Sequence, residues 1–278
     1  MLRTMITASN TLNQLQSQID TISNNISNSN TVGYKTKEAR FSELLYQQFN
    51  NDEMDTTVRQ SPVGIRYGVG ARIGQIQTNH AQGNLQNTDR DLDLAFTKEK
   101  QYFNILMPDE NGQRVVYSRQ GDFYVSPVAN GQVMLVNGDG YAVADSNGQA
   151  IYFPDNVKNF NLTNDGMLLV NYEDGETLSF ELGVTELQKP QVMEHVSGTY
   201  IALPANLNEL GYNQGDVLTN LQGAARNEIG IAKGKLEMSN VDLSKEMTDL
   251  INAQRSYQFN SRAISIADQM LGLINGIR

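Results

Sequence analysis

The chain has 278 residues, no cysteine, no tryptophan and a formal net charge of −10. This length is enough to bury a hydrophobic core, and it predicts one to three domains. The missing cysteines exclude disulfides, thiolate metal sites and cysteine nucleophiles. Residues 1–40 carry +2 and residues 235–278 are neutral, so the acidic charge lies in the middle of the chain. An acidic middle argues against binding to nucleic acid or to an anionic membrane surface.

Residues 4–27 are predicted to form a helix, because apolar side chains recur there three and four residues apart. This first seam consists of Met5, Ala8, Leu12, Leu15, Ile19, Ile22 and Ile26. The Asn- and Ser-rich run that ends at Gly33 and Tyr34 then stops the helix. Residues 35–50 are interpreted as a short helix, with Phe41, Leu44, Leu45 and Phe49 on one side, and residues 51–75 as extended.

The pattern changes from about residue 76 to residue 225, where Asn-Gly and Asp-Gly pairs recur. Such pairs are the strongest short-range hairpin signal. Their glycines are Gly112, Gly131, Gly138, Gly140, Gly148, Gly166 and Gly175. Predicted strands lie between them, at 102–107, 114–118, 132–136, 150–153, 167–172, 177–184 and 199–203. Strands at this spacing predict an all-β sandwich or barrel.

A second helix is predicted from about residue 243 to residue 276, after an extended segment, with Ser239 or Asp242 as its cap. Its seam consists of Leu243, Leu250, Ala253, Tyr257, Ile264, Ala267, Leu271 and Ile274, with Glu246 and Asn260 as the polar members. The two seams lie more than 200 residues apart, and we expect them to pair with each other and with neighbouring copies.

The predicted fold class is therefore α+β, with terminal helices forming a coiled-coil layer, an inserted all-β module and extended connecting segments. The predicted segments are the first helix at 1–34, a brace at 35–75, the β-rich outer domain at 76–225, an extended segment at 226–242 and the last helix at 243–278. No stretch approaches the ~20 apolar residues that would span a bilayer. No apolar run of a secretory leader follows Arg3 either.

Candidate catalytic groupings are weak. Asp89, Asp91 and Asp93 alternate but are not followed by the glycine of a calcium loop, so a solvated strand face is the preferred interpretation. His80 and His195 stand far apart in sequence and are expected to be structural. The chain also has no phosphate-binding loop and no nucleophile elbow. We therefore expect no enzyme activity, no cofactor and no metal site.

Both ends of the chain carry motifs that resemble those of flagellar rod and hook proteins. The amino-terminal stretch 24–35 is similar to their Asn-Asn-(Ile/Leu)-Ala-Asn-x-x-Thr-x-Gly-(Tyr/Phe)-Lys signature, with Ser27 in place of alanine. The stretch 236–271 resembles their carboxy-terminal motif, and 117–123 resembles their Tyr-(Thr/Ser)-Arg-x-Gly-x-Phe segment. The motif residues are Asn24, Asn25, Asn30, Thr31, Gly33, Tyr34, Ser239, Asn240, Val241, Asp242, Gln254, Arg255 and Tyr257.

The resemblance implies a structural subunit of the flagellar basal-body rod, close to the distal rod type, that transmits torque from motor to hook. Its terminal helices would line a hollow axial tube, and its partners would be further copies, other rod and hook subunits and the flagellar type III export apparatus. It would leave the cell without a cleaved signal peptide. A proximal rod or hook-type subunit is the alternative within the family. A β-rich surface-binding protein that oligomerises through its helices is the alternative from another class.

Overall fold

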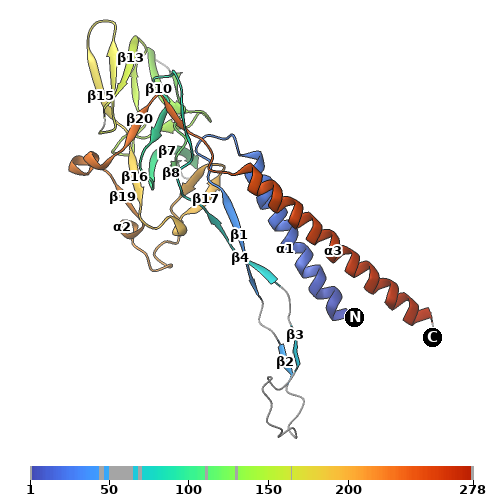
Figure 1. Ribbon diagram of the computed structural model, residues 1–278. Helices are drawn as coiled ribbons and strands as arrows, with labels where there is room; N and C mark the ends of the chain where they lie inside the picture. Colours follow the sequence, from blue (N-terminus) through green and yellow to red (C-terminus); the bar gives the residue numbers. More distant parts are fainter. Residues whose placement is uncertain are drawn as a thin grey trace. The chain divides into compact units, whose positions relative to one another are not determined.

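The computed structural model describes residues 2–43, 47–49, 65–67, 71–109, 112–128, 131–163 and 165–276. These residues form two compact units, which are described separately below. The helical unit comprises Met1–Ser27, Lys37–Gln77 and Asp242–Arg278, and the β-rich unit comprises Asn28–Thr36 and Thr78–Val241. Terminal helices and a large β-rich module make the fold α+β, as predicted (Figure 1).

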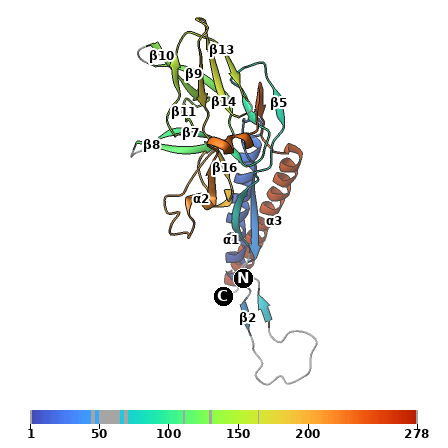
Figure 2. The same cartoon turned by 90° about the vertical axis from the view of Figure 1, so that its left-hand side faces the viewer.

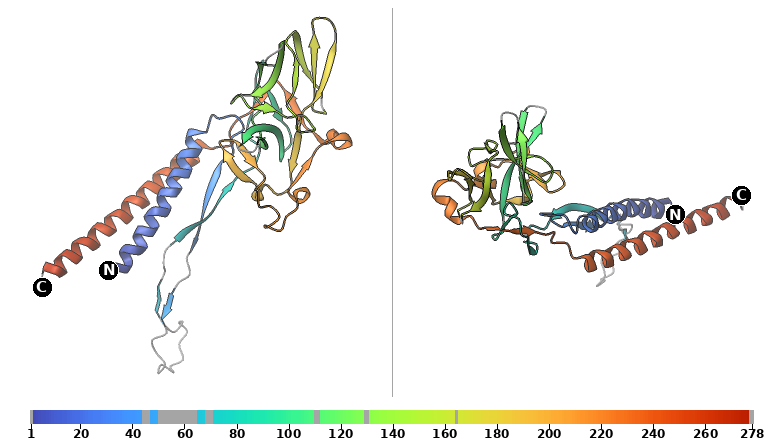
Figure 3. Two further views of the ribbon diagram at one scale, coloured as in Figure 1. Left: turned by 180° about the vertical axis from the view of Figure 1, so that it is seen from behind. Right: turned by 90° about the horizontal axis from the view of Figure 1, so that it is seen from above.

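Two long helices dominate the helical unit. Helix α1 (Leu2–Ser27) and helix α3 (Leu243–Gly276) lie side by side and run in opposite directions, so Leu2 and Gly276 lie toward the same end of the pair and α3 extends further (Figures 1 and 3). Asp242 caps α3, because its Oδ1 accepts hydrogen bonds from the backbone N–H groups of Ser244 and Lys245. In the described part of the chain, neither helix combines the length and the apolar character needed to cross a bilayer.

A two-stranded ribbon completes the helical unit. Strand β1 (Lys37–Glu43) pairs with β4 (Ala71–Thr78), and β2 (Gln47–Phe49) pairs with β3 (Ile65–Tyr67). The helix predicted for residues 35–50 is therefore wrong. A short apolar run fits the periodicity of a helix as well as that of a strand. Here pairing with a strand about 30 residues away makes the segment extended. Two residues of that prediction, Leu44 and Leu45, lie outside the described residues.

The β-rich unit is built on a ten-stranded sheet, whose main path is β12-β10-β11-β7-β8-β18-β17, with β9, β16 and β19 attached beside it (Figure 2). Its central hairpin joins β7 to β8 in continuous antiparallel register. The strands of this sheet are β7 (Gln101–Asp109), β8 (Gly112–Ser118), β9 (Phe123–Val128), β10 (Gln132–Asn137), β11 (Ala142–Val143), β12 (Tyr152–Pro154), β16 (Val184–Leu187), β17 (Glu194–Ser197), β18 (Tyr200–Ala202) and β19 (Leu218–Asn220).

A three-stranded antiparallel sheet packs against the large one. It contains β13 (Val157–Leu162), β14 (Met167–Tyr172) and β15 (Thr177–Glu181). The main hydrophobic core draws side chains from both sheets, among them Ile105, Leu135 and Phe153 from one and Leu168 and Val170 from the other. This two-layer packing is what the alternating strands and frequent turns predicted.

Short elements close the β-rich unit. Strand β5 (Leu85–Asn87) pairs with β21 (Lys235–Glu237), and β6 (Leu94–Phe96) pairs with β20 (Ile231–Lys233). Residues that precede α3 in sequence thereby lie against residues that precede the large sheet. The remaining elements are helix α2 (Gln214–Val217) and the 3-10 helices η2 (Pro190–Val192) and η3 (Gly223–Glu228).

Most predicted strands are present, at β7, β8, β10, β12, β14 and β18. The run predicted at 177–184 is two strands, β15 and β16, because the chain leaves the small sheet and joins the large one between them. The strands that were not predicted in this region are β5, β6, β9, β11, β13, β17 and β19. At the predicted turns, glycines such as Gly140 and Gly175 adopt a positive φ, which side chains with a Cβ avoid.

Candidate functional site

A buried ion triad lies in the β-rich unit, where segments far apart in sequence meet. The Glu237 carboxylate accepts from Lys35 Nζ at 2.6 Å and from Arg119 Nε at 2.6 Å. It also accepts from the backbone N–H of Gly83 at 2.9 Å. All three charged side chains are removed from solvent, so these are charge-assisted hydrogen bonds in a low-dielectric setting. One substitution in the triad would leave a buried charge without its partner.

Other donors of the two cations bond to backbone carbonyls. Arg119 donates through its terminal nitrogens to the backbone carbonyls of Lys98 and Gln101 at 3.2–3.3 Å. Lys35 donates to the carbonyl of Ala81 at 2.7 Å. The triad therefore ties together chain segments around residues 35, 81, 100, 119 and 237.

Gly33 and Tyr34 bring Lys35 to this triad. The Gly33 N–H donates to the backbone carbonyl of Glu237 at 2.8 Å, and Tyr34 is almost fully buried. Gly33 has φ +71°, and a Cβ at this position would lie 2.6 Å from the backbone nitrogen of Gln120 and 2.7 Å from the carbonyl carbon of Arg119. Glycine is therefore required both for the backbone conformation and for the close approach of another segment.

Asn240 fixes Thr36, the residue that follows the amino-terminal motif. Its Oδ1 accepts from the Thr36 backbone N–H at 2.8 Å and from the Thr36 hydroxyl at 2.7 Å. Its Nδ2 donates to the carbonyls of Asn79 and Ala81, both at 3.0 Å. One carboxamide thus satisfies four groups, which aspartate or leucine at this position would not do. The Ser239 hydroxyl accepts from the Val241 N–H at 3.3 Å in the same turn.

The triad carries one more positive than negative charge, and this excess affects neighbouring groups. Burial lowers the pKa of Lys35, and the charge of Glu237 opposes that effect. Burial, together with repulsion from Lys35, lowers the pKa of His80 to about 4. The neutral His80 ring shares a 2.8 Å hydrogen bond with the Tyr102 hydroxyl, which agrees with the structural role expected for it. His195 Nε2 lies 2.7 Å from the Thr78 hydroxyl.

The helical unit holds the predicted seams. On α1, Leu15 and Ile22 are buried, and Leu12, Ile19 and Ile26 are partly buried. On α3, the seam positions from Glu246 to Leu271 are buried or partly buried, namely Glu246, Leu250, Ala253, Tyr257, Asn260, Ile264, Ala267 and Leu271. Leu243 and Ile274, at the two ends of that seam, are exposed. The part that these residues play in assembly stays a prediction.

Asn25 of the amino-terminal motif joins α1 to the ribbon. Its Nδ2 donates to the Lys37 carbonyl at 2.8 Å, and its Oδ1 accepts from the Lys37 N–H at 3.0 Å. The Asn25 side chain thereby bonds both backbone groups of Lys37, the first residue of β1, as a neighbouring strand would. Of the other motif residues, Thr31 donates to Asn28 Oδ1, while Gln254 and Arg255 lie on the exposed side of α3.

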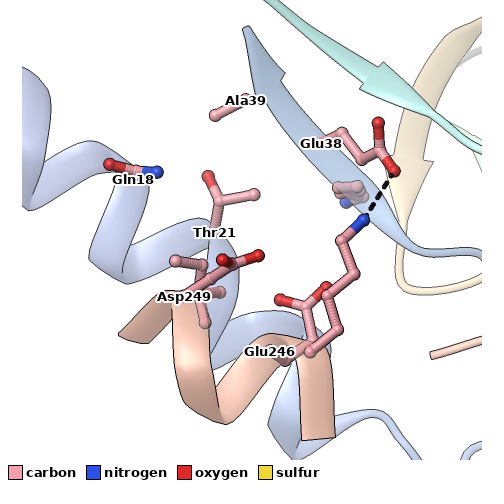
Figure 4. Close-up of a pocket in the computed structure, with 9 residues that line it drawn as sticks. Gln18, Thr21, Glu38, Ala39, Glu246 and Asp249 are labelled. Atoms are coloured by element: carbon pink, nitrogen blue, oxygen red, sulfur yellow. Dashed lines mark hydrogen bonds and ion pairs between the residues drawn. The ribbon is translucent and has the colours of Figure 1, made fainter. Parts of the chain in front are cut away.

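A small polar pocket of 170 Å³ lies among α1, β1 and α3 (Figure 4). Glu38 from β1 and Lys245 from α3 form an ion pair of 3.4 Å beside it. Glu246 and Asp249 also line it, and burial raises the pKa of Glu246. The ion pair beside the pocket links β1 to α3.

The Asp-x-Asp-x-Asp run does not form the solvated strand face that we expected. Asp93 is buried and pairs with Arg90 at 3.0 Å, and Asp91 pairs with Lys233 at 2.9 Å. The segment forms a bend and a turn, and Asp93 makes an isolated antiparallel bridge with Asp122. Within the described ranges, no three His, Cys, Asp or Glu side chains are placed to hold a metal ion.

Three family patterns match the chain. They are described as "Flagella basal body rod protein" at residues 5–35, "Flagellar hook protein FlgE/F/G D1 domain" at 98–170 and "Flagellar basal body rod FlgEFG protein C-terminal" at 232–277. Flagellar hook-basal body complex protein FlhP of Bacillus subtilis is 46% identical over 285 residues, covering all of both chains. Flagellar basal-body rod protein FlgG of the same species is 30% identical, covering 98% of this chain and 97% of its own. The FlgG of Caulobacter vibrioides is 33% identical, covering 98% of each.

The chain belongs to the flagellar basal-body rod family. Membership places it in the basal body of the bacterial flagellum and confirms the resemblance found in the sequence. The buried triad takes one member from each of the three matched segments, namely Lys35, Arg119 and Glu237. The motifs of this rod-family protein are therefore parts of one contact in the fold. Sequence reasoning noted the three motifs separately, and nothing in their spacing showed that the charges would meet.

Proposed function

We propose that this protein is a structural subunit of the flagellar rod, and that its terminal helices polymerise with those of further copies into a hollow axial tube. The tube would transmit torque from motor to hook, with other rod and hook subunits above and below. The observation that carries the proposal is an apolar row on α3 that the paired helix α1 leaves uncovered.

This outer row consists of Phe259, Ala263, Ile266, Met270 and Leu273, at successive spacings of four, three, four and three residues. Such spacing is that of a coiled-coil seam. The exposed fractions are 75% for Phe259, 55% for Ile266 and 70% for Leu273. The row is distinct from the seam that faces α1, so one helix offers two apolar tracks and the isolated subunit covers only one of them.

Contiguous exposed apolar surface is unfavourable in water, so a patch of this kind marks an interaction site that a partner covers. A second copy supplies helices of the same kind, and the same argument applies to Ile6 of α1, which is 61% exposed. Repetition of one contact without closure builds a helical tube rather than a dimer.

The experiment replaces Ile266 by aspartate and tests swimming and basal-body assembly in a strain that lacks the wild-type protein. Because Ile266 is exposed in the subunit, Ile266→Asp leaves the helical content of the purified protein unchanged but places a carboxylate in the assembled contact, and motility is lost. The matched control is Gln258→Asp, an exposed position of α3 outside the outer row, which should swim normally. Normal swimming of Ile266→Asp would refute the row as an assembly surface.

The position along the axial structure has a second candidate. The 46% identical relative is named a hook-basal body complex protein, so a proximal rod or hook-type position is supported about as well as the distal one. Electron micrographs of basal bodies from a deletion strain separate these, because the axial structure ends where the missing subunit begins. Export through the flagellar type III apparatus, without a cleaved signal peptide, belongs to the same proposal. It predicts that the protein recovered from basal bodies still carries its first helix.

A further inference from the structure

The β-rich unit contains a second pocket, of 380 Å³, that the proposed function does not use. Asn104 of β7 and Tyr117 of β8 line it and stand opposite each other in the β7–β8 register, so their side chains share one face of the sheet. The turn at Ser146–Gly148 and the segment 214–222 supply further lining residues. The volume falls within the range typical of small-molecule sites, roughly 300–1,000 Å³.

Two deeply buried polar side chains line this pocket. Asn104 is 7% exposed and Tyr117 is 5% exposed. The Tyr117 hydroxyl has no hydrogen-bond partner among the described residues, and it is not among their fully enclosed unpaired atoms. It therefore keeps contact with solvent, and the pocket that it lines provides that contact. The carboxamides of Asn104 and Asn220 both contact the Thr185 hydroxyl, at 2.7 and 2.8 Å, and because this hydroxyl has one proton it donates to one of them and accepts from the other.

The lining restricts the chemistry of a ligand. Among the described residues that line the pocket there is no carboxylate, so cations and ammonium groups have no counter-charge. Arg114 is the one charged residue, and it already donates to the Leu203 carbonyl and lies 3.8 Å from Glu194. A strongly anionic ligand would have to compete with these two partners for the guanidinium.

We infer that this pocket binds a neutral sugar residue. Carboxamides such as Asn104, Gln214 and Asn220 both donate and accept, which is what a ring of hydroxyl groups requires. The buried phenol adds a further donor, and burial raises its pKa, so it keeps its proton. Val115 and Leu203 provide apolar lining for the C–H face of a sugar ring.

The test is saturation-transfer NMR on the full chain with three neutral trisaccharides, maltotriose, cellotriose and tri-N-acetylchitotriose, at millimolar concentration. We expect at least one of them to bind. Tyr117→Phe, which removes a hydroxyl that has no protein partner, should weaken that binding about fivefold, as loss of one hydrogen bond does. Tyr124→Phe is the matched control, because Tyr124 is an exposed tyrosine of β9 that does not line the pocket, and it should leave binding unchanged.

Gln214→Ala gives a second variant at the pocket rim and should weaken the same sugar. The inference is overturned if none of the three trisaccharides binds, or if binding is the same in wild type, Tyr117→Phe and Gln214→Ala. Binding of a tetra-alanine peptide in the absence of sugar binding would also overturn it, since it would make the pocket a peptide site. None of these outcomes bears on polymerisation through the outer row of α3, which the motility of Ile266→Asp measures separately.

Discussion

The Glu237→Gln substitution tests whether the buried triad holds the β-rich unit together. Glutamine keeps the shape of the side chain and one acceptor oxygen, but it removes the negative charge that pairs with both Lys35 and Arg119. The Lys35 side chain is 7% exposed and that of Arg119 is 0% exposed, so neither cation can turn to water without opening the structure.

The expected cost follows from this geometry. Removing one partner of a buried ion pair costs about 3–5 kcal/mol, and here one substitution breaks two pairs. The two costs do not simply add, because Lys35 already has a lowered pKa and can give up its proton, whereas Arg119 cannot. We therefore expect a loss of about 3–5 kcal/mol, a large part of the total stability of an ordinary domain, which is about 5–15 kcal/mol.

The assay is urea unfolding of the full chain followed by far-ultraviolet circular dichroism and tyrosine fluorescence, which together separate the β-rich transition from the helical one. Glu176→Gln, an exposed turn position in the same unit, is the control and should change stability by less than about 0.5 kcal/mol. A loss below about 1 kcal/mol in Glu237→Gln would show that the triad is not a buried, coupled unit.

The variant should also show a characteristic pH dependence. Without Glu237, the folded state favours neutral Lys35 still more strongly, while the unfolded lysine titrates at its ordinary pKa of about 10.4. The unfolded state then binds more protons over the interval below that value, so the stability of Glu237→Gln should rise as the pH rises toward 10.

Two further predictions concern the same region. Gly33→Ala should destabilise the β-rich unit by several kcal/mol, because the added Cβ would meet backbone atoms of Arg119 and Gln120. The control is Gly140→Ala, at φ +85° with open space around it, which should cost only about 1–2 kcal/mol. Equal losses of stability in urea unfolding would contradict the close approach at Gly33. His80 has a folded pKa of about 4 against 6.5 when unfolded, so the unfolded state binds more protons between these values and stability should fall by up to about 3 kcal/mol from pH 7 to pH 4. His80→Gln should lack that fall, and parallel stability curves for the two proteins would refute the assignment.

The sequence by itself determined the local elements. Apolar spacing of three and four residues predicted α1 and α3. Asp242 was one of the two predicted caps of α3, and it could be recognised in the sequence because capping depends on adjacent residues alone. Turns with glycine at a positive φ were equally readable, as at Gly140 and Gly175. The ribbon could not be predicted from the sequence. Residues 37–43 are extended because they pair with β4, and a run this short shows no periodicity that separates a strand from a helix.

Only the tertiary structure decided which of these elements share a contact. Lys35 and Glu237 stand 202 positions apart. A buried cation requires a buried anion as its partner, but the sequence does not show which acidic residue will be that partner. The covered and uncovered tracks of α3 likewise look alike in sequence, since both repeat every three and four residues, and packing against α1 selects one of them. Periodic and turn signals depend on neighbouring residues and survive in the sequence, whereas the pairing of distant charges and faces exists only once the chain has folded.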